Sequence, residues 1–81
     1  MKILKFYSDT CMPCKNMQNF LDSEGISTTG VNIATDLDLV EKYGVMNVPT
    51  LILVDDDGIE QDRLVGFNSL IVGKVRVWQK S

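Results

Sequence analysis

Both cysteines of the chain stand in one short segment, Cys11-Met12-Pro13-Cys14. Two thiols at this spacing can close a small disulfide and open it again. The apolar run of residues 3–7 precedes the pair, and a stretch that permits a helix follows it. A cysteine pair at the point where a strand leads into a helix is typical of dithiol–disulfide chemistry.

The sequence context predicts different tasks for the two thiols. A helix that begins at Cys11 offers that sulfur unpaired backbone N–H groups and the positive end of the helix dipole, and both stabilise a thiolate. Cys14 is expected one turn further along, on the same side of the helix but more buried. We therefore predict that Cys11 is the nucleophile that attacks an exposed disulfide, and that Cys14 resolves the mixed disulfide.

Metal binding and an inert buried pair are the alternatives for these cysteines. Structural zinc usually takes four Cys or His ligands, and the chain has two Cys and no His. A zinc site would therefore need carboxylates or a second subunit. The acidic run of residues 55–58, Asp-Asp-Asp-Gly, lacks the alternate spacing and the final Glu of a calcium loop, so we interpret it as a hairpin turn. We expect no metal site and no cofactor.

The composition is that of a small domain without a strong charge bias. The chain has 81 residues, of which 44% are apolar and 23% are charged, and its formal net charge is −3. We expect a single domain, 1–81, with a lean core. The eight Lys and Arg residues are scattered from Lys2 to Lys80. Because they form no basic patch, we expect no nucleic-acid partner.

The beginning of the chain does not predict export or membrane insertion. Its apolar run is interrupted by Lys5 and ends at Ser8-Asp9, which makes it too short for a signal peptide. No stretch approaches the roughly 18 continuous apolar residues of a membrane span. We expect no membrane association and a reducing, cytoplasmic setting, where a cysteine pair is more often catalytic or metal-binding than a permanent cross-link.

Hydrophobic spacing and turn residues predict an α/β chain with the element order βαβαββα. The predicted strands are residues 2–8, 28–33, 50–54 and 59–65. The predicted helices are residues 12–24, the segment between Asp36 and Gly44, and residues 69–79. Asp36 is a candidate N-cap for the second helix, and Trp78 in the last helix is interpreted as a core anchor. The first βαβ unit implies a pair of parallel strands.

Two segments resemble the thioredoxin/glutaredoxin superfamily. They are residues 6–15, FYSDTCMPCK, and residues 43–51, YGVMNVPTL, and both Asp57-Gly58 and Gly66 follow them in the expected order. The likeness covers nearly the whole chain, which resembles a small glutaredoxin-like thioredoxin. It implies a minimal thioredoxin fold, in which three helices flank a four-stranded mixed sheet, without the additional N-terminal strand and helix of full-length thioredoxins.

The resemblance also implies a surface that receives the substrate. In the family, the proline at the position of Pro49 is cis, packs against the cysteine pair and shields it from metals. The backbone of the preceding residue, here Val48, pairs with an extended substrate peptide, which is a form of strand addition. The candidate substrate-binding residues are therefore Met12, Pro13, Val48, Pro49, Gly66 and Phe67.

The sequence departs from both well-known branches of the superfamily. Thr10 stands where thioredoxins typically have Trp, and Met-Pro replaces their Gly-Pro between the cysteines. Residues 66–68, Gly-Phe-Asn, lack the Gly-Gly and Asp with which glutaredoxins grip glutathione. Gly66-Phe67 is instead similar to the sequence of small glutaredoxin-like hydrogen donors to ribonucleotide reductase.

Lys5 is a further departure, because thioredoxins bury an Asp at this place. Gly30 stands where they carry the Lys that pairs with this Asp. Two interpretations of Lys5 are open. Its ammonium could be solvated at a strand edge, or it could favour a thiolate electrostatically. We expect the first.

The sequence therefore predicts a thiol–disulfide oxidoreductase that reduces protein disulfides through Cys11 and Cys14. The expected partners are proteins that contain disulfides, with a thioredoxin reductase or a glutathione system as the reductant, and the expected state is a monomer. The alternatives are a dedicated hydrogen donor to ribonucleotide reductase and a binding module bridged by a metal or an iron–sulfur cluster.

Overall fold

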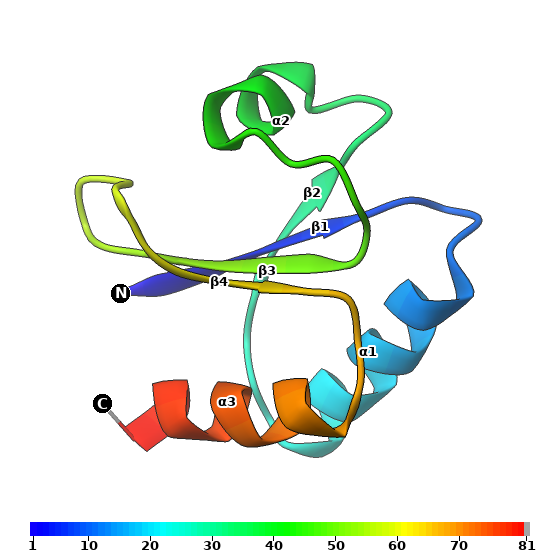
Figure 1. Cartoon of the computed structure of the whole chain (residues 1–81), viewed down its shortest axis with the longest axis vertical. Coiled ribbons are helices and arrows are strands. Elements are labelled where there is room, and N and C mark those ends of the chain that lie inside the picture. The colour runs from blue at the N-terminus through cyan, green and yellow to red at the C-terminus, as the bar shows by residue number, and fades with distance from the viewer. Residues whose placement is uncertain (81) are drawn as a thin grey trace.

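The computed structural model describes residues 1–80 and contains four strands and three helices in that part of the chain. The strands are β1 (Lys2–Tyr7), β2 (Thr29–Asn32), β3 (Thr50–Val54) and β4 (Glu60–Val65). The helices are α1 (Met12–Ser23), α2 (Leu37–Tyr43) and α3 (Ser69–Lys80) (Figure 1). The order βαβαββα and the α/β class predicted from the sequence are confirmed.

The four strands form one mixed sheet in the order β2-β1-β3-β4. β1 runs parallel to β2 and antiparallel to β3, and β3 runs antiparallel to β4. β1 is therefore an inner strand, with Lys5 opposite Gly30 on one side and opposite Leu51 on the other. The expectation that Lys5 lies at a strand edge is wrong, because both neighbouring positions in the sheet are occupied.

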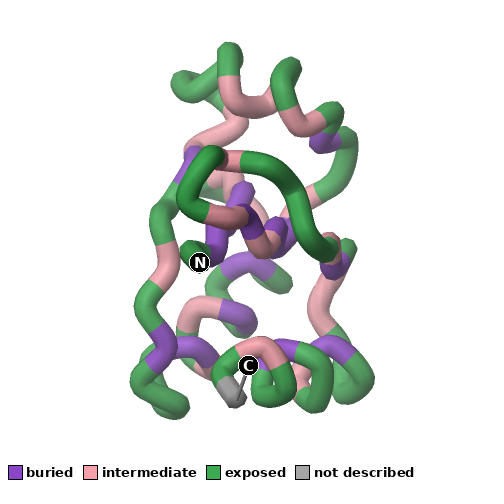
Figure 2. Tube along the Cα trace, turned by 90° about the vertical axis from the view of Figure 1, so that its left-hand side faces the viewer, coloured by how far each residue is buried: buried purple, intermediate pink, exposed green. Residues whose placement is uncertain are grey.

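Helices cover both faces of the sheet (Figure 1). α1 and α3 lie on one face, and their core includes Ile3 of β1 and Leu21 of α1. α2 lies on the other face, over a core that includes Leu4 and Phe6 of β1. Successive side chains of a strand point to opposite faces, so β1 contributes to both cores. Figure 2 shows that the buried residues follow the sheet and the inner sides of the helices below it.

The ends of α2 show one prediction that is correct in position and wrong in mechanism. Asp36 is the N-cap residue, but its side chain makes no capping hydrogen bond to the helix. Its carboxylate instead accepts a hydrogen bond from the Asn32 backbone N–H at 3.0 Å, which ties the helix start to the end of β2. At the other end, Gly44 has φ +62°, a left-handed conformation that glycine adopts at little cost and that ends the helix.

The acidic run between β3 and β4 forms a turn that its first carboxylate organises. Asp55 Oδ1 accepts hydrogen bonds from the backbone N–H groups of Asp57 and Ile59, at 2.9 Å and 3.0 Å. This is the local bonding that makes Asp common in turns. β4 begins at Glu60, so Ile59 precedes the strand. A register irregularity follows at Gln61, between the pairs Val54–Glu60 and Leu53–Asp62.

Within residues 1–80, no helix is long and apolar enough to cross a membrane.

We predict that Leu21→Ala lowers the free energy of unfolding by about 2–5 kcal/mol, because it opens a cavity in the core beneath α1. The Leu21 side chain is 0% exposed, whereas Leu70 of α3 is 76% exposed. Leu70→Ala is therefore the matched control, with an expected change within about 0.5 kcal/mol. Urea denaturation of both variants measures the difference. Equal losses at the two sites would show that the core is not where the structure places it.

Candidate active site

Three connecting loops meet at one end of the sheet (Figure 1). The loop after β1 carries the cysteines, and the loop before β3 carries Val48 and Pro49. β3 runs antiparallel to both of its neighbours, so its beginning lies beside the ends of β1 and β4. The Gly66 N–H after β4 donates a hydrogen bond to the Pro49 carbonyl at 2.8 Å. The topology thus brings together the sequence-predicted site residues from three distant parts of the chain.

Cys11 and Cys14 are joined by a disulfide at the N-terminus of α1, with their Cα atoms 5.2 Å apart. Cys11 is the N-cap residue of the helix. Its sulfur accepts a hydrogen bond from the Cys14 backbone N–H at 3.1 Å. A thiolate formed at Cys11 would keep this donor and would gain from the positive end of the helix dipole.

The two sulfurs differ in their access to solvent. Cys11 is partly exposed, whereas Cys14 is 4% exposed. Met12 and Pro13 between them are exposed, Met12 to 62%. A reagent that approaches from solvent therefore meets Cys11 first.

The loop before β3 is fixed from inside the protein. The Val48–Pro49 peptide bond is cis, and the Pro49 side chain is fully buried. Thr50, which is 1% exposed, donates a hydrogen bond from Oγ1 to the Asn47 carbonyl at 2.6 Å. Val48 packs against the core on the α2 face, and Met46 is 91% exposed. The loop thus combines an anchored backbone with an exposed apolar side chain.

The segment after β4 contributes more backbone than side chain to this end of the sheet. Gly66 has φ +84°, a left-handed conformation that favours glycine. Phe67 is half-buried and packs against the core on the α1 and α3 face. Its ring lies 5.9 Å from that of Phe20, between ring centres. Phe67, one of the two substrate-binding residues predicted in this segment, is thus held largely by the core.

Lys5 is buried and lines the same cavity as Cys14, so the expectation that it is solvated is wrong. Its side chain is 9% exposed, and its ammonium donates a hydrogen bond to Gln18 Oε1 of α1. The ammonium also lies 5.1 Å from the centre of the Tyr7 ring. Burial lowers the pKa of Lys5, while the carboxylate of Asp22 acts in the opposite direction.

A cavity of about 220 Å³ connects Lys5 with Cys14, since Lys5, Gln18 and Cys14 all line it. Sequence reasoning missed Gln18. The spacing of Gln18 from Cys14 could have indicated it, because residues four apart lie on the same face of a helix.

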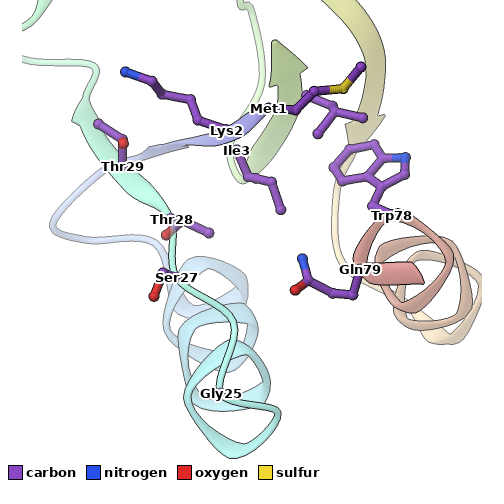
Figure 3. Close-up of a pocket in the computed structure, with 10 residues that line it drawn as sticks. Met1, Lys2, Ile3, Gly25, Ser27, Thr28, Thr29, Trp78 and Gln79 are labelled. Atoms are coloured by element: carbon purple, nitrogen blue, oxygen red, sulfur yellow. The ribbon is translucent and has the colours of Figure 1, made fainter. Parts of the chain in front are cut away.

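A larger hollow lies away from the cysteines. It has a volume of about 680 Å³ and is lined by the beginning of β1, the segment before β2 and the end of α3. Figure 3 shows Ile3, Trp78 and Gln79 around it. Trp78 packs against the core and donates a hydrogen bond from Nε1 to Asp62 at 3.0 Å, which agrees with its interpretation as an anchor. The hollow holds no pair of groups suited to redox chemistry.

The described part of the chain, residues 1–80, contains no cluster of three or more His, Cys, Asp or Glu side chains that could hold a metal ion.

The fold and the cysteine pair together define a thiol–disulfide oxidoreductase of the thioredoxin type. The thioredoxin family model matches residues 1–73. The chain therefore belongs to the thioredoxin family, as the resemblance in its sequence implies.

Individual relatives agree with this assignment. The chain is 36% identical over 67 residues to the SPbeta prophage-derived thioredoxin-like protein YosR of Bacillus subtilis, which covers 83% of this chain and 84% of that protein. It is 38% identical over 69 residues to a thioredoxin of Chlamydia caviae, covering 79% of this chain and 67% of that protein. The solved thioredoxin of Fasciola hepatica superposes with a TM-score of 0.79 at 22% identity, over 94% of this chain and 77% of that one, which shows the common fold.

We predict that Thr50→Val lowers the free energy of unfolding by about 1–3 kcal/mol, because it leaves the Asn47 carbonyl without its donor while the side-chain volume stays nearly unchanged. The exposed Thr29 of β2 provides the control. Thr29→Val should change the stability by no more than about 0.5 kcal/mol. Urea denaturation compares the two variants. A Thr50→Val protein as stable as the parent would show that this hydrogen bond does not hold the loop.

Proposed function

We propose that this protein reduces disulfide bonds in other proteins, with Cys11 as the nucleophile and Cys14 as the resolving cysteine. The observation that carries the proposal is the unequal burial of two bonded sulfurs at one helix N-terminus. The accessible sulfur has a backbone N–H donor at 3.1 Å, which suits a thiolate. The buried sulfur is already within bonding distance of its partner.

The reaction runs in two exchanges. The Cys11 thiolate attacks one sulfur of the substrate disulfide, and the other substrate sulfur leaves as a thiolate and takes up a proton. The Cys14 thiolate then attacks Cys11 Sγ, which releases the second substrate sulfur and forms the Cys11–Cys14 disulfide. The substrate gains two electrons and two protons, and the protein loses them.

The exposed groups around Cys11 favour a protein substrate. Met12 between the cysteines and Met46 in the loop before β3 are both exposed, and flexible thioethers adapt to varied apolar partners. We propose that the Val48 backbone pairs with an extended segment of the substrate, and that Pro13, Pro49, Gly66 and Phe67 complete the contact surface.

We propose that a thioredoxin reductase, rather than glutathione, returns the oxidised protein to its dithiol form. Support comes from membership of the thioredoxin family and from residues 66–68, which lack the glutathione-gripping Gly-Gly and Asp. We propose that the protein works in a reducing compartment, the cytoplasm, where such a reductant is present. We further propose that it acts as a monomer.

A coupled assay tests the proposed function. The purified chain is given insulin as the disulfide substrate, with NADPH and thioredoxin reductase in one arm and with NADPH, glutathione and glutathione reductase in the other. We expect NADPH consumption in the first arm. Consumption in neither arm, together with metal bound to the purified protein, would overturn the proposal in favour of a metal-bridged binding module. A third arm with ribonucleotide reductase as substrate tests the dedicated hydrogen donor.

Substitution of each cysteine by serine tests the division of roles. Cys11→Ser should reduce insulin turnover to the background rate, because the attacking sulfur is gone. Cys14→Ser should retain the attack but not the release, so that a mixed disulfide with insulin accumulates. Non-reducing electrophoresis with mass spectrometry detects this adduct. Accumulation in Cys11→Ser instead of Cys14→Ser would reverse the two roles.

A further inference from the structure

The position of Lys5 in the sheet directs its side chain toward α1, the helix that begins at the disulfide. β1 is an inner strand, and alternate residues of a strand share a face. Ile3 belongs to the core beneath α1 and α3, so Lys5, two residues further on, faces the same layer. Its hydrogen bond to Gln18 confirms this direction, because Gln18 lies on α1 four residues after Cys14.

In the part of the chain that the structure describes, the Lys5 ammonium has no anionic partner in direct contact. Within residues 1–80, its direct partners are the neutral amide of Gln18 and the face of the Tyr7 ring, and none of the salt bridges involves it. The carboxylate of Asp22 is separated from it by Gln18, whose Nε2 donates to Asp22 Oδ1 at 2.7 Å.

The other charged groups of the cavity wall are exposed. Asp9 and Lys15 line the same cavity as Lys5 and Cys14, and both of these side chains face solvent. Water screens their charges, whereas it screens the charge of Lys5 less, because that side chain is 9% exposed. Among the charged side chains that line the cavity with Cys14, Lys5 is therefore the one least screened by water.

We propose that Lys5 is an electrostatic positioning residue, which raises the thiolate fraction of the buried Cys14 in the reduced protein. The reduced protein is then a weaker reductant than a variant with a neutral residue at position 5. This inference rests on the proposed function, since it concerns the resolving step. When the disulfide is closed, both sulfurs are neutral, and among residues 1–80 the ammonium has no counter-charge in direct contact, only the more distant carboxylate of Asp22. When the disulfide is reduced, the Cys14 thiolate supplies that charge, so Lys5 favours the reduced form.

The same charge acts during resolution. The proton that Cys14 loses when it becomes a thiolate goes to water through the mouth of the cavity, beside the exposed side chains of Asp9 and Lys15. The Cys14 thiolate then forms a bond to Cys11 Sγ as the bond from Cys11 to the substrate sulfur breaks, and the electron pair leaves on the substrate sulfur. Lys5 keeps its own proton throughout. Its positive charge stabilises the Cys14 thiolate, and no atom of Lys5 is transferred.

The first test isolates the Cys14 thiol in the Cys11→Ser protein. The rate of its alkylation by iodoacetamide is measured against pH, with Lys5 present or replaced by Met or by Gln. We expect both replacements to lower the thiolate fraction of Cys14 at neutral pH by about tenfold, since a nearby opposite charge changes the ratio of thiolate to thiol by about tenfold or more. Two neutral residues of different polarity are used so that loss of packing in one does not decide the outcome.

Lys15→Met is the matched control, because it removes the same charge from an exposed side chain next to Cys14. It should change the thiolate fraction by less than about twofold, as expected for a charge screened by water. An effect equal to that of the Lys5 variants would overturn the proposal, because a general positive potential would then explain both. Unchanged profiles in Lys5→Met and Lys5→Gln would overturn it as well.

The second test measures the equilibrium of the two-cysteine protein with dithiothreitol. At a fixed ratio of reduced to oxidised dithiothreitol, Lys5→Met and Lys5→Gln should raise the ratio of disulfide to dithiol by about three- to tenfold, and Lys15→Met should leave it nearly unchanged. No change, or a shift toward the dithiol, contradicts the inference. Because neither test uses a protein substrate or a reductase, their failure is distinguishable from failure of insulin reduction.

Discussion

The inner position of β1 is the constraint on which the rest of this protein depends. Because strands lie on both sides of it and helices lie on both faces of the sheet, each of its buried side chains must enter one of two packed layers. Ile3 enters one, whereas Leu4 and Phe6 enter the other. The same alternation sends Lys5 beneath α1 and brings the chain to the cysteines as the strand ends. This one short strand thus contributes side chains to both cores and leads into the segment that carries both cysteines.

The site is assembled by the sheet and completed by short polar contacts. The antiparallel run of β3 puts its beginning beside the cysteine loop, and the hydrogen bond from Gly66 to Pro49 ties a third segment to it. Thr50 fixes the same loop from below. Few of these groups take part in thiol exchange themselves. Their effect is to hold an exposed sulfur, a buried sulfur and a substrate-facing backbone in one arrangement.

The sequence predicted the element order and the cysteine chemistry because these depend on local patterns. Apolar runs, Gly44 and the spacing of Cys11 and Cys14 are all visible within a few residues. The environment of Lys5 was not predicted, since a charged residue in an apolar run fits an edge strand as well as an inner one, and only the pairing with Gly30 and Leu51 distinguishes them. Asp36 was placed correctly, but whether its carboxylate would turn toward the helix or toward Asn32 depended on where β2 ended.

The placement of Trp78 has a practical consequence for spectroscopy. It is the only tryptophan of the chain, and it lines a hollow with Met1 and Lys2, at the beginning of β1. The disulfide lies beyond the other end of that strand. The indole fluorescence of Trp78 therefore reports the docking of α3 on the sheet, at the end of β1 away from the disulfide. The unfolding of the oxidised and of the reduced protein can accordingly be followed with the same intrinsic fluorophore.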